Sequence, residues 1–316
     1  MIDKWRGMAL IGHFPLPSRD MKYPALFSKQ LALLTLSALL AAGCATTPSE
    51  PAFVPTKPQP NPPPSQQWPV TTTAQPPGPR PNPAIVPVPQ QAAPNSNYQR
   101  VHQQFVAQAQ KGDIDLLFVG DSITDFWIGA SSNGRGGRGK EVWDHYYGNL
   151  KAADFGYSAD RTQHVLWRLQ NGEGQGFSPK VVVLMIGTNN TGIVSRRPQD
   201  FPSAWRNTNA ETIEGITAVV NELRKDFPQA KIILLSIFPR GDDAIAMQQI
   251  PEINRAIAKL DDQKQVFYLD VTKNFLGPDG QINPDYFQLS DRLHPTPAGY
   301  VVWAEAMKPL LKKLMQ

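Results

Sequence analysis

The apolar residues in the last two thirds of the chain form short continuous runs, separated by stretches with a helical repeat. The runs lie at residues 115–120, 152–156, 180–187, 231–238 and 265–271. The helical repeats lie at residues 162–171, 208–227, 248–260 and 296–315. Continuous apolar strands that alternate with amphipathic helices indicate a parallel sheet covered on both faces. The pattern predicts an α/β fold for residues 98–316, a three-layer α/β/α sandwich with a mainly five-stranded parallel sheet.

The chain begins differently. Two lysines, at positions 22 and 29, precede the apolar run LALLTLSALLAA at residues 31–42, which ends at Gly43 and Cys44. About a dozen apolar residues are too few to span a bilayer as a helix, and they match the apolar core of a secretory signal. A short buried helix is the alternative, but the flanks show no amphipathic repeat. We predict a signal peptide over residues 1–43, with Met21 as the expected start.

Cys44 is the single cysteine of the chain, so it has no partner for an internal disulfide. The preceding residues give the sequence LAAGC, which resembles the bacterial lipobox. That resemblance implies that Cys44 is lipidated and becomes the new N-terminus, with several acyl chains holding the protein on a membrane. Ala45 stands where an inner-membrane retention signal has aspartate, which favours the outer membrane. We therefore expect a location in the cell envelope.

Residues 44–97 form a proline-rich segment, which we interpret as a lipidated N-terminus followed by a disordered linker. Of the 31 prolines in the chain, 17 lie between Pro48 and Pro94. Such a composition buries too little apolar surface to offset the entropy lost on ordering, and it favours extended polyproline II. At about 3.1 Å per residue the segment would reach on the order of 150 Å. It is either a spacer between anchor and domain or a tail without a length requirement.

The net charge of the chain gives no evidence for a nucleic-acid partner. The net charge is +4, but residues 1–43 contain five of the 31 basic and two of the 27 acidic residues. Removal of the signal peptide leaves 26 basic and 25 acidic residues. A nearly neutral chain has no general attraction to a polyanion, so we expect no nucleic-acid partner.

Ser122 follows the first predicted strand directly, in the sequence FVGDSIT. In a parallel sheet, ligand sites lie at the carboxyl ends of the strands, where a nucleophile can meet backbone N–H groups. Serine also caps helices, so Ser122 alone could be an ordinary N-cap. The choice between these interpretations depends on the partners that Ser122 finds further along the chain.

A serine nucleophile needs a base, usually a histidine that a carboxylate holds in place. His294 lies in DRLHPTPAGY, three residues after Asp291. Positions i and i+3 of one turn lie on the same side, so Asp291 can bind Nδ1 of His294 and leave Nε2 for Ser122. We expect structural roles for the other three histidines of the domain, His102, His145 and His164.

Hydrolysis of an acyl group also needs donors for the developing oxyanion. Asn189, in IGTNN, supplies a side-chain amide at a strand end, although asparagine is also a common turn residue. Residues 155–169 supply backbone N–H groups where another strand turns into a helix. Both segments are predicted to lie at the same edge of the sheet as Ser122.

With these segments together, residues 98–316 resemble the SGNH/GDSL hydrolase superfamily. More narrowly, they resemble bacterial acetylhydrolases related to the catalytic subunits of platelet-activating-factor acetylhydrolase. The motifs that carry the resemblance are FVGDSIT, DRTQHVLWRLQNGE, LMIGTNN, IFPRG and DRLHPTPAGY. The resemblance implies a flavodoxin-like fold, catalysis by Ser122, His294 and Asp291, and an oxyanion hole formed by Ser122, Ala159 and Asn189.

Ala159 departs from the family pattern, which has glycine before the aspartate of this block. Alanine keeps the N–H group but is expected to fit only with a negative φ. No cluster of His, Cys and Asp has metal-ligand spacing, so the sequence predicts neither a metal nor another cofactor.

The substrate is less well defined by the sequence. Short gaps between the motifs leave no room for a helical lid, which favours a small acyl group such as acetyl. Residues 129–143 include Arg135, Arg138 and Lys140, which either contact a polar substrate or lie on a solvated loop. We expect Arg161, Trp167 and Arg168 to be helix-packing and surface residues.

Three functions remain open at this point. The first is an exported serine esterase that removes acetyl groups from a glycan or cell-wall component. The second is a lipid acylhydrolase that acts on lysophospholipid or platelet-activating-factor-like esters. The third is a catalytically silent binding module on a surface tether, and the oligomeric state is open in all three.

Overall fold

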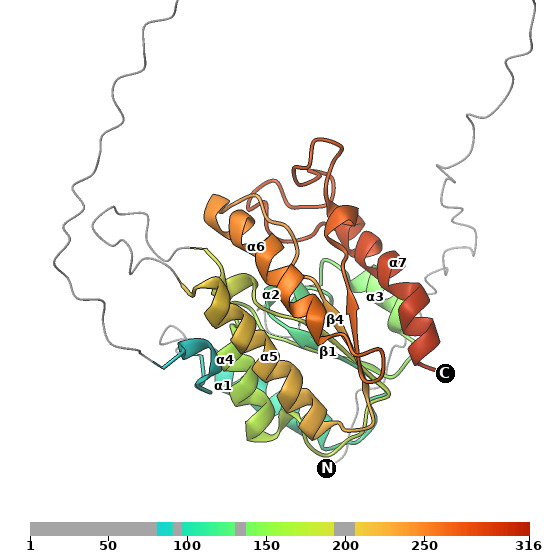
Figure 1. Ribbon diagram of the computed structural model, residues 1–316. Coiled ribbons are helices and arrows are strands. Elements are labelled where there is room, and N and C mark those ends of the chain that lie inside the picture. The colour runs from blue at the N-terminus through green and yellow to red at the C-terminus, as the bar shows by residue number, and fades with distance from the viewer. Residues whose placement is uncertain (1–80, 91–96, 130–136, 193–205) are drawn as a thin grey trace, which may run out of the picture. The chain divides into compact units, whose positions relative to one another are not determined.

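The computed structural model in Figure 1 describes residues 81–90, 97–129, 137–192 and 206–316. The predicted signal peptide, Cys44 and the first part of the linker lie outside the described residues. Five strands form one sheet in the order β2-β1-β3-β4-β5, and every neighbouring pair is parallel. The strands are β1 (Leu116–Gly120), β2 (Ala152–Gly156), β3 (Val181–Met185), β4 (Lys231–Leu235) and β5 (Val266–Leu269). The predicted five-stranded parallel sheet is confirmed.

Helices connect the strands and cover both faces of the sheet. They are α1 (Tyr98–Ala109), α2 (Ser122–Asp125), α3 (Lys140–Tyr147), α4 (Thr162–Arg168), α5 (Asn209–Asp226), α6 (Ala244–Ile257) and α7 (Pro297–Leu314). Helix α6 begins four residues before the predicted position because the Asp243 side chain accepts hydrogen bonds from the N–H groups of Ile245 and Ala246. Among the described residues, no helix combines the length and apolar character needed to cross a membrane.

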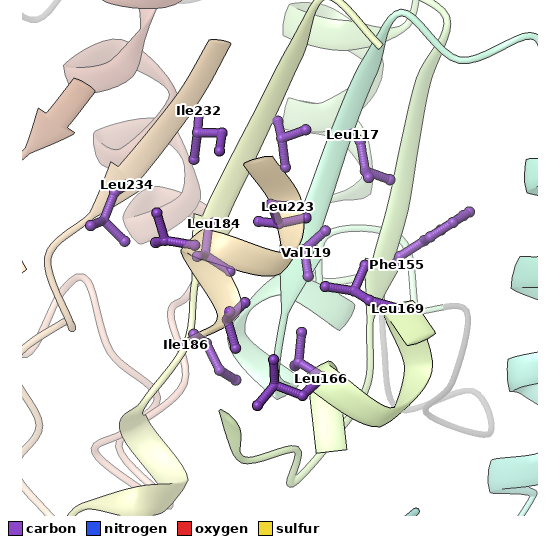
Figure 2. Packing of buried hydrophobic residues seen from close by; sticks show 14 of the residues in the cluster. Leu117, Val119, Phe155, Leu166, Leu169, Leu184, Ile186, Leu223, Ile232 and Leu234 are labelled. Atoms are coloured by element: carbon purple, nitrogen blue, oxygen red, sulfur yellow. The ribbon is translucent and has the colours of Figure 1, made fainter. Parts of the chain in front are cut away.

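Alternate residues of each strand pack into two separate apolar layers. Leu117 and Val119 of β1 join one layer with residues of α1, α4, α5 and α6. Figure 2 shows part of this layer, where strand residues lie beside Leu166 and Leu223. Phe118 of β1 joins the other layer with residues of α3 and α7, including several tryptophans. The predicted three-layer α/β/α sandwich is therefore present.

Residues 81–90 pack on the folded domain, which corrects the predicted linker. The short 3₁₀ helix η1 (Pro83–Ile85) contacts α5 and α4, and its Ala84 is fully buried. The Thr162 hydroxyl donates a hydrogen bond of 2.8 Å to the backbone oxygen of Ala84. The predicted domain start at residue 98 is too late for this segment, because its prolines favour an extended chain but do not prevent it from docking.

The order of the strands determines where the site lies. From β1 the chain goes to β2 on one side and then to β3 on the other, so the carboxyl end of β1 lies at a topological switch point. Ser122, Ala159 and Asn189 follow β1, β2 and β3, which are neighbours in the sheet. Helix α2 packs closely on this edge, since a Cβ at Gly156 would overlap the backbone nitrogen of Asp125. The fold thus brings three separate motifs to one place.

Candidate active site

Ser122 is the first residue of α2, and its hydroxyl faces His294 rather than its own backbone. Asp121 caps this helix, because its side chain accepts from the Ile123 N–H at 3.0 Å. Ser122 is 8% exposed, and its Oγ lies 2.9 Å from Nε2 of His294, 172 residues further along the chain. The interpretation of Ser122 as an ordinary N-cap is wrong, since Asp121 has that role.

Asp291 and His294 form the short-range pair that their spacing predicts. Oδ2 of Asp291 lies 2.9 Å from Nδ1 of His294. The other carboxylate oxygen accepts from the N–H groups of Leu293 and His294, each at 3.0 Å. These three hydrogen bonds fix the carboxylate and the ring in one turn. The structure therefore brings Ser122, His294 and Asp291 into one continuous hydrogen-bonded chain.

The electrostatic environment favours an ionised Asp291 and a neutral His294. Burial raises the pKa of Asp291, but the N–H groups and the ring of His294 lower it by more, so the net direction is down. Burial lowers the pKa of His294; Asp291 opposes this and the Arg138 charge adds to it, so the net direction is again down. At neutral pH the imidazole can donate from Nδ1 to Asp291 and accept the Ser122 proton at Nε2.

Arg138 belongs to this site, which the sequence left open. Its Cζ lies 4.8 Å from the ring centroid of Phe126, and the Phe126 centroid lies 4.7 Å from that of His294. Nη1 of Arg138 is 4.0 Å from Oδ2 of Asp291. Lys140, by contrast, pairs with Asp144 on the exposed side of α3, and Arg135 lies outside the described residues. Of the cations in the 129–143 segment, Arg138 is the one that the structure places beside the histidine.

The backbone conformation of Ala159 is not the one we predicted. We expected alanine to fit only with a negative φ, but Ala159 has φ +66°. The turn is closed by the Asp160 N–H, which donates to the Tyr157 oxygen at 3.1 Å, and Ala159 is its third residue. A positive φ at that position favours glycine, so alanine retains the turn at a cost of roughly 1–2 kcal/mol.

Asn189 lies against this turn, in the 3₁₀ helix η3 (Thr188–Asn190) after β3. Its Nδ2 donates to the backbone oxygen of Asp160 at 2.9 Å, which uses one of the two amide hydrogens. Within the described residues, the N–H groups of Ser122 and Ala159 donate to no other group. Three donors from three strand ends thus retain capacity for a ligand oxygen.

A buried ionic network lies behind the Ala159 turn, and sequence reasoning missed it. Nε of Arg168 lies 2.8 Å from Oδ2 of Asp160, and its Nη1 binds Glu173. Glu173 also binds Nδ1 of His102 at 2.7 Å. Burial would lower the pKa of Arg168, but Glu173 and Asp160 raise it, so the guanidinium stays charged. Arg168 packs inside the domain, as expected for a packing residue, but it is not a surface residue. It is 1% exposed and forms ion pairs with Asp160 and Glu173.

Of the remaining histidines, His164 binds the backbone and His145 lies away from the Ser122 site. Nδ1 of His164 accepts the Arg161 N–H at 3.1 Å, so that nitrogen carries no proton. Burial, with the charges of Arg161 and Arg168, lowers the pKa of His164 to about 4. His145 lies on α3 and lines a cavity of about 430 Å³ between α3 and α7, which shares no residue with the Ser122 site.

Residues 118–302 match the model of the GDSL-like lipase/acylhydrolase family. The chain belongs to this family. As a GDSL-like acylhydrolase it is a carboxylic ester hydrolase, and the matched region contains Ser122, Ala159, Asn189, Asp291 and His294.

Among similar proteins is platelet-activating factor acetylhydrolase IB subunit alpha2 of Gallus gallus, 34% identical over 74% of this chain and 91% of its own. Subunit alpha1 of Homo sapiens is 30% identical over the same shares. A solved GDSL-like lipase from Bacteroides thetaiotaomicron superposes with a TM-score of 0.52 at 20% identity, covering 69% of this chain and 98% of that one. That likeness shows that the two proteins share a fold.

Proposed function

We propose that this acylhydrolase is a serine esterase that removes short acyl groups, acetyl in particular, by a two-step acyl-enzyme mechanism. The observation that carries the proposal is the pair of 2.9 Å hydrogen bonds that joins Ser122, His294 and Asp291. A serine hydroxyl is a weak nucleophile at neutral pH, and a neutral imidazole held by a carboxylate is the group that activates it.

In the first step Nε2 of His294 takes the proton of Ser122 as Oγ attacks the ester carbonyl. The negative oxygen that forms is bound by the N–H groups of Ser122 and Ala159 and by the second amide hydrogen of Asn189. His294 then protonates the alcohol, which leaves. Water releases the acid from Ser122 by the same route, and Asp291 stabilises the imidazolium in both halves.

An acetyl preference is supported by the two acetylhydrolase subunits at 34% and 30% identity. Their names also support the second candidate, a lipid acylhydrolase that acts on platelet-activating-factor-like esters. The predicted signal peptide and lipobox favour a glycan or cell-wall substrate instead, because both direct the protein to the cell envelope. A silent binding module gains no support, since the catalytic side chains are intact and in hydrogen-bonded contact.

Hydrolysis of p-nitrophenyl acetate, butyrate and octanoate tests the reaction and the acyl preference together. The protein used begins at Ala45, so that it keeps the docked segment 81–90 and lacks the predicted lipidated cysteine. We expect the acetate to react fastest and Ser122→Ala to remove the activity at every chain length. A preference for octanoate would favour the lipid acylhydrolase, and equal rates in the wild type and Ser122→Ala would contradict the mechanism.

The proposed location is a lipid anchor at Cys44 in the cell envelope, on the outer membrane. Fractionation of cells that express the full chain tests it, with radiolabelled palmitate as the probe. We expect label in the membrane-bound wild type and neither label nor membrane retention in Cys44→Ala. Membrane retention of an unlabelled Cys44→Ala protein would contradict the anchor.

A further inference from the structure

Two arginines that the mechanism does not use lie beside the predicted oxyanion hole. Arg206 donates from Nη1 to the backbone oxygen of Asn189 at 3.3 Å. Arg161 directly follows Asp160, whose backbone oxygen binds the Asn189 side chain at 2.9 Å. Asn189 is therefore in contact with Arg206 on one side and with the residue before Arg161 on the other.

The neighbouring Asn190 ties the two arginine-bearing segments together. Its Oδ1 accepts from the Thr162 N–H at 3.1 Å, and its Nδ2 donates to the Asn207 side chain at 3.1 Å. Thr162 and Asn207 are the residues that follow Arg161 and Arg206. Asn190 is completely buried, and it joins the Thr162 backbone to the Asn207 side chain. Arg161 and Arg206 are therefore each next in the chain to a residue that one buried side chain holds.

Asp160 precedes Arg161 in the chain, the charges of Asp242 and Asp243 act on Arg206, and all three carboxylates have other partners. Asp160 binds Arg168 at 2.8 Å, and Asp242 binds Arg240 through both oxygens at 2.7 and 2.6 Å. Asp243 accepts from the first N–H groups of α6. Within the described part of the chain, neither Arg161 nor Arg206 forms an ion pair with a carboxylate, and Nε of Arg206 is buried without a hydrogen-bond partner.

Both guanidinium groups are half-buried, and the local charges oppose them. Burial lowers the pKa of Arg161, and the Arg206 charge lowers it further. Burial and the Arg240 charge lower the pKa of Arg206, while Asp243 and Asp242 raise it by less. Two partly desolvated cations, one of which lowers the pKa of the other, are unfavourable without a carboxylate partner, and an anion that reaches both would relieve that cost.

We propose that Arg161 and Arg206 form a subsite for an oxyanion, a carboxylate or a phosphate, carried by the alcohol part of the ester substrate. This inference rests on the proposed function, because it is Asn189 that places the subsite next to the reacting carbonyl. An acetyl group has no room for a second charged group, so the anion belongs to the alcohol. The subsite would select acetylated molecules that bear an acidic group near the ester.

The test compares charged and neutral aryl acetates by acetate release. The substrates are 4-acetoxybenzoate, 4-acetoxyphenyl phosphate and the neutral 4-acetoxybenzamide. For each protein we take the ratio of kcat/KM for a charged substrate to kcat/KM for the neutral one. Differences in leaving-group reactivity cancel when this ratio is compared between a variant and the wild type. We expect the ratio to fall about tenfold or more in Arg161→Gln/Arg206→Gln, and we expect added salt to lower the ratio of the wild type. The substrate with the larger fall distinguishes carboxylate from phosphate.

Matched controls separate this role from a structural one. Arg100→Gln/Arg255→Gln removes the same charge from exposed positions on α1 and α6, and we expect less than a twofold change in the ratio. An equal fall for charged and neutral substrates in Arg161→Gln/Arg206→Gln would overturn the subsite, because it would show damage to the oxyanion hole alone. If the double variant does not fold, the single variants and Arg206→Lys carry the same comparison.

A binding measurement makes the inference independent of the proposed reaction. Calorimetric titration of inorganic phosphate into the Ser122→Ala protein should give saturable binding that Arg161→Gln/Arg206→Gln abolishes. Binding without any wild-type esterase activity would keep the subsite and reject the proposed function. Esterase activity with neither phosphate binding nor charge preference would reject the subsite and keep the function.

Discussion

In the described part of the domain, two histidine–carboxylate hydrogen bonds have nearly equal lengths and different surroundings. Nδ1 of His294 lies 2.9 Å from Asp291, and Nδ1 of His102 lies 2.7 Å from Glu173. The first pair is three residues apart in one turn, and its Nε2 meets a serine. The second is 71 residues apart, and its ring packs on Trp167 at 4.8 Å.

A hydrogen bond between a histidine and a carboxylate therefore does not identify a catalytic site by itself. Glu173 holds His102 and Arg168 together, and that network supports the turn of Ala159 and Asp160 from behind. Asp291 instead holds His294, whose other nitrogen lies 2.9 Å from the Ser122 hydroxyl. We propose that the first pair transfers a proton and that the second stabilises the framework, and the following predictions test this division.

The largest expected effect comes from removing each histidine in turn. His294→Ala should lower kcat/KM for p-nitrophenyl acetate by about 10⁴-fold or more and leave the unfolding midpoint nearly unchanged, because it removes the base. His102→Ala should retain most of the activity and lower the free energy of unfolding by about 1–3 kcal/mol. Urea unfolding and steady-state kinetics on both variants decide the point, and an exchange of the two results would reverse the assignment.

Glu173→Gln breaks the buried network at its centre. It leaves Arg168 with Asp160 as its single acidic partner in a fully buried position, so we expect a loss of about 3 kcal/mol in stability. Denaturant unfolding measures it. The exposed Glu141→Gln on α3 is the control, with an expected change below about 0.5 kcal/mol. Similar losses in both variants would mean that the network contributes little.

The pH dependence of kcat/KM reports on His294 in the free enzyme. Only the unprotonated imidazole can act as the base, so activity rises as pH increases through its pKa. Because burial and Arg138 depress that pKa, the acid limb should lie below the usual imidazole value near 6.5. Arg138→Met removes a charge that opposes protonation, so the limb should move to higher pH. A shift to lower pH would show that Arg138 acts mainly through Asp291.

The smallest effect concerns the strained turn. Ala159→Gly removes the Cβ at φ +66° and should raise the free energy of unfolding by about 0.5–1 kcal/mol, after the extra backbone entropy of glycine is counted. Thermal unfolding of the two proteins measures the difference. A destabilised glycine variant would mean that the turn relaxes elsewhere and that alanine carries no strain there.

Much of the site was predictable because it depends on local rules. Each strand appeared as an apolar run, and parallel strands place their carboxyl ends at one edge, so Ser122 and Asn189 had to lie near each other. Asp291 and His294 needed only the geometry of one turn. Glu173 was not predictable as the partner of His102, since no periodicity indicates a contact across 71 residues.

The sequence by itself determined the parallel α/β/α architecture and the residues of the hydrogen-bonded triad, because apolar period and short spacing are local properties of the chain. Only the tertiary structure decided the left-handed conformation of Ala159, the docking of residues 81–90 and the place of Arg138 beside His294. It also decided that Arg161 and Arg206 have no carboxylate partner in the part of the chain that the structure describes. Each of these depends on which distant groups surround a residue, and packing alone brings those groups together.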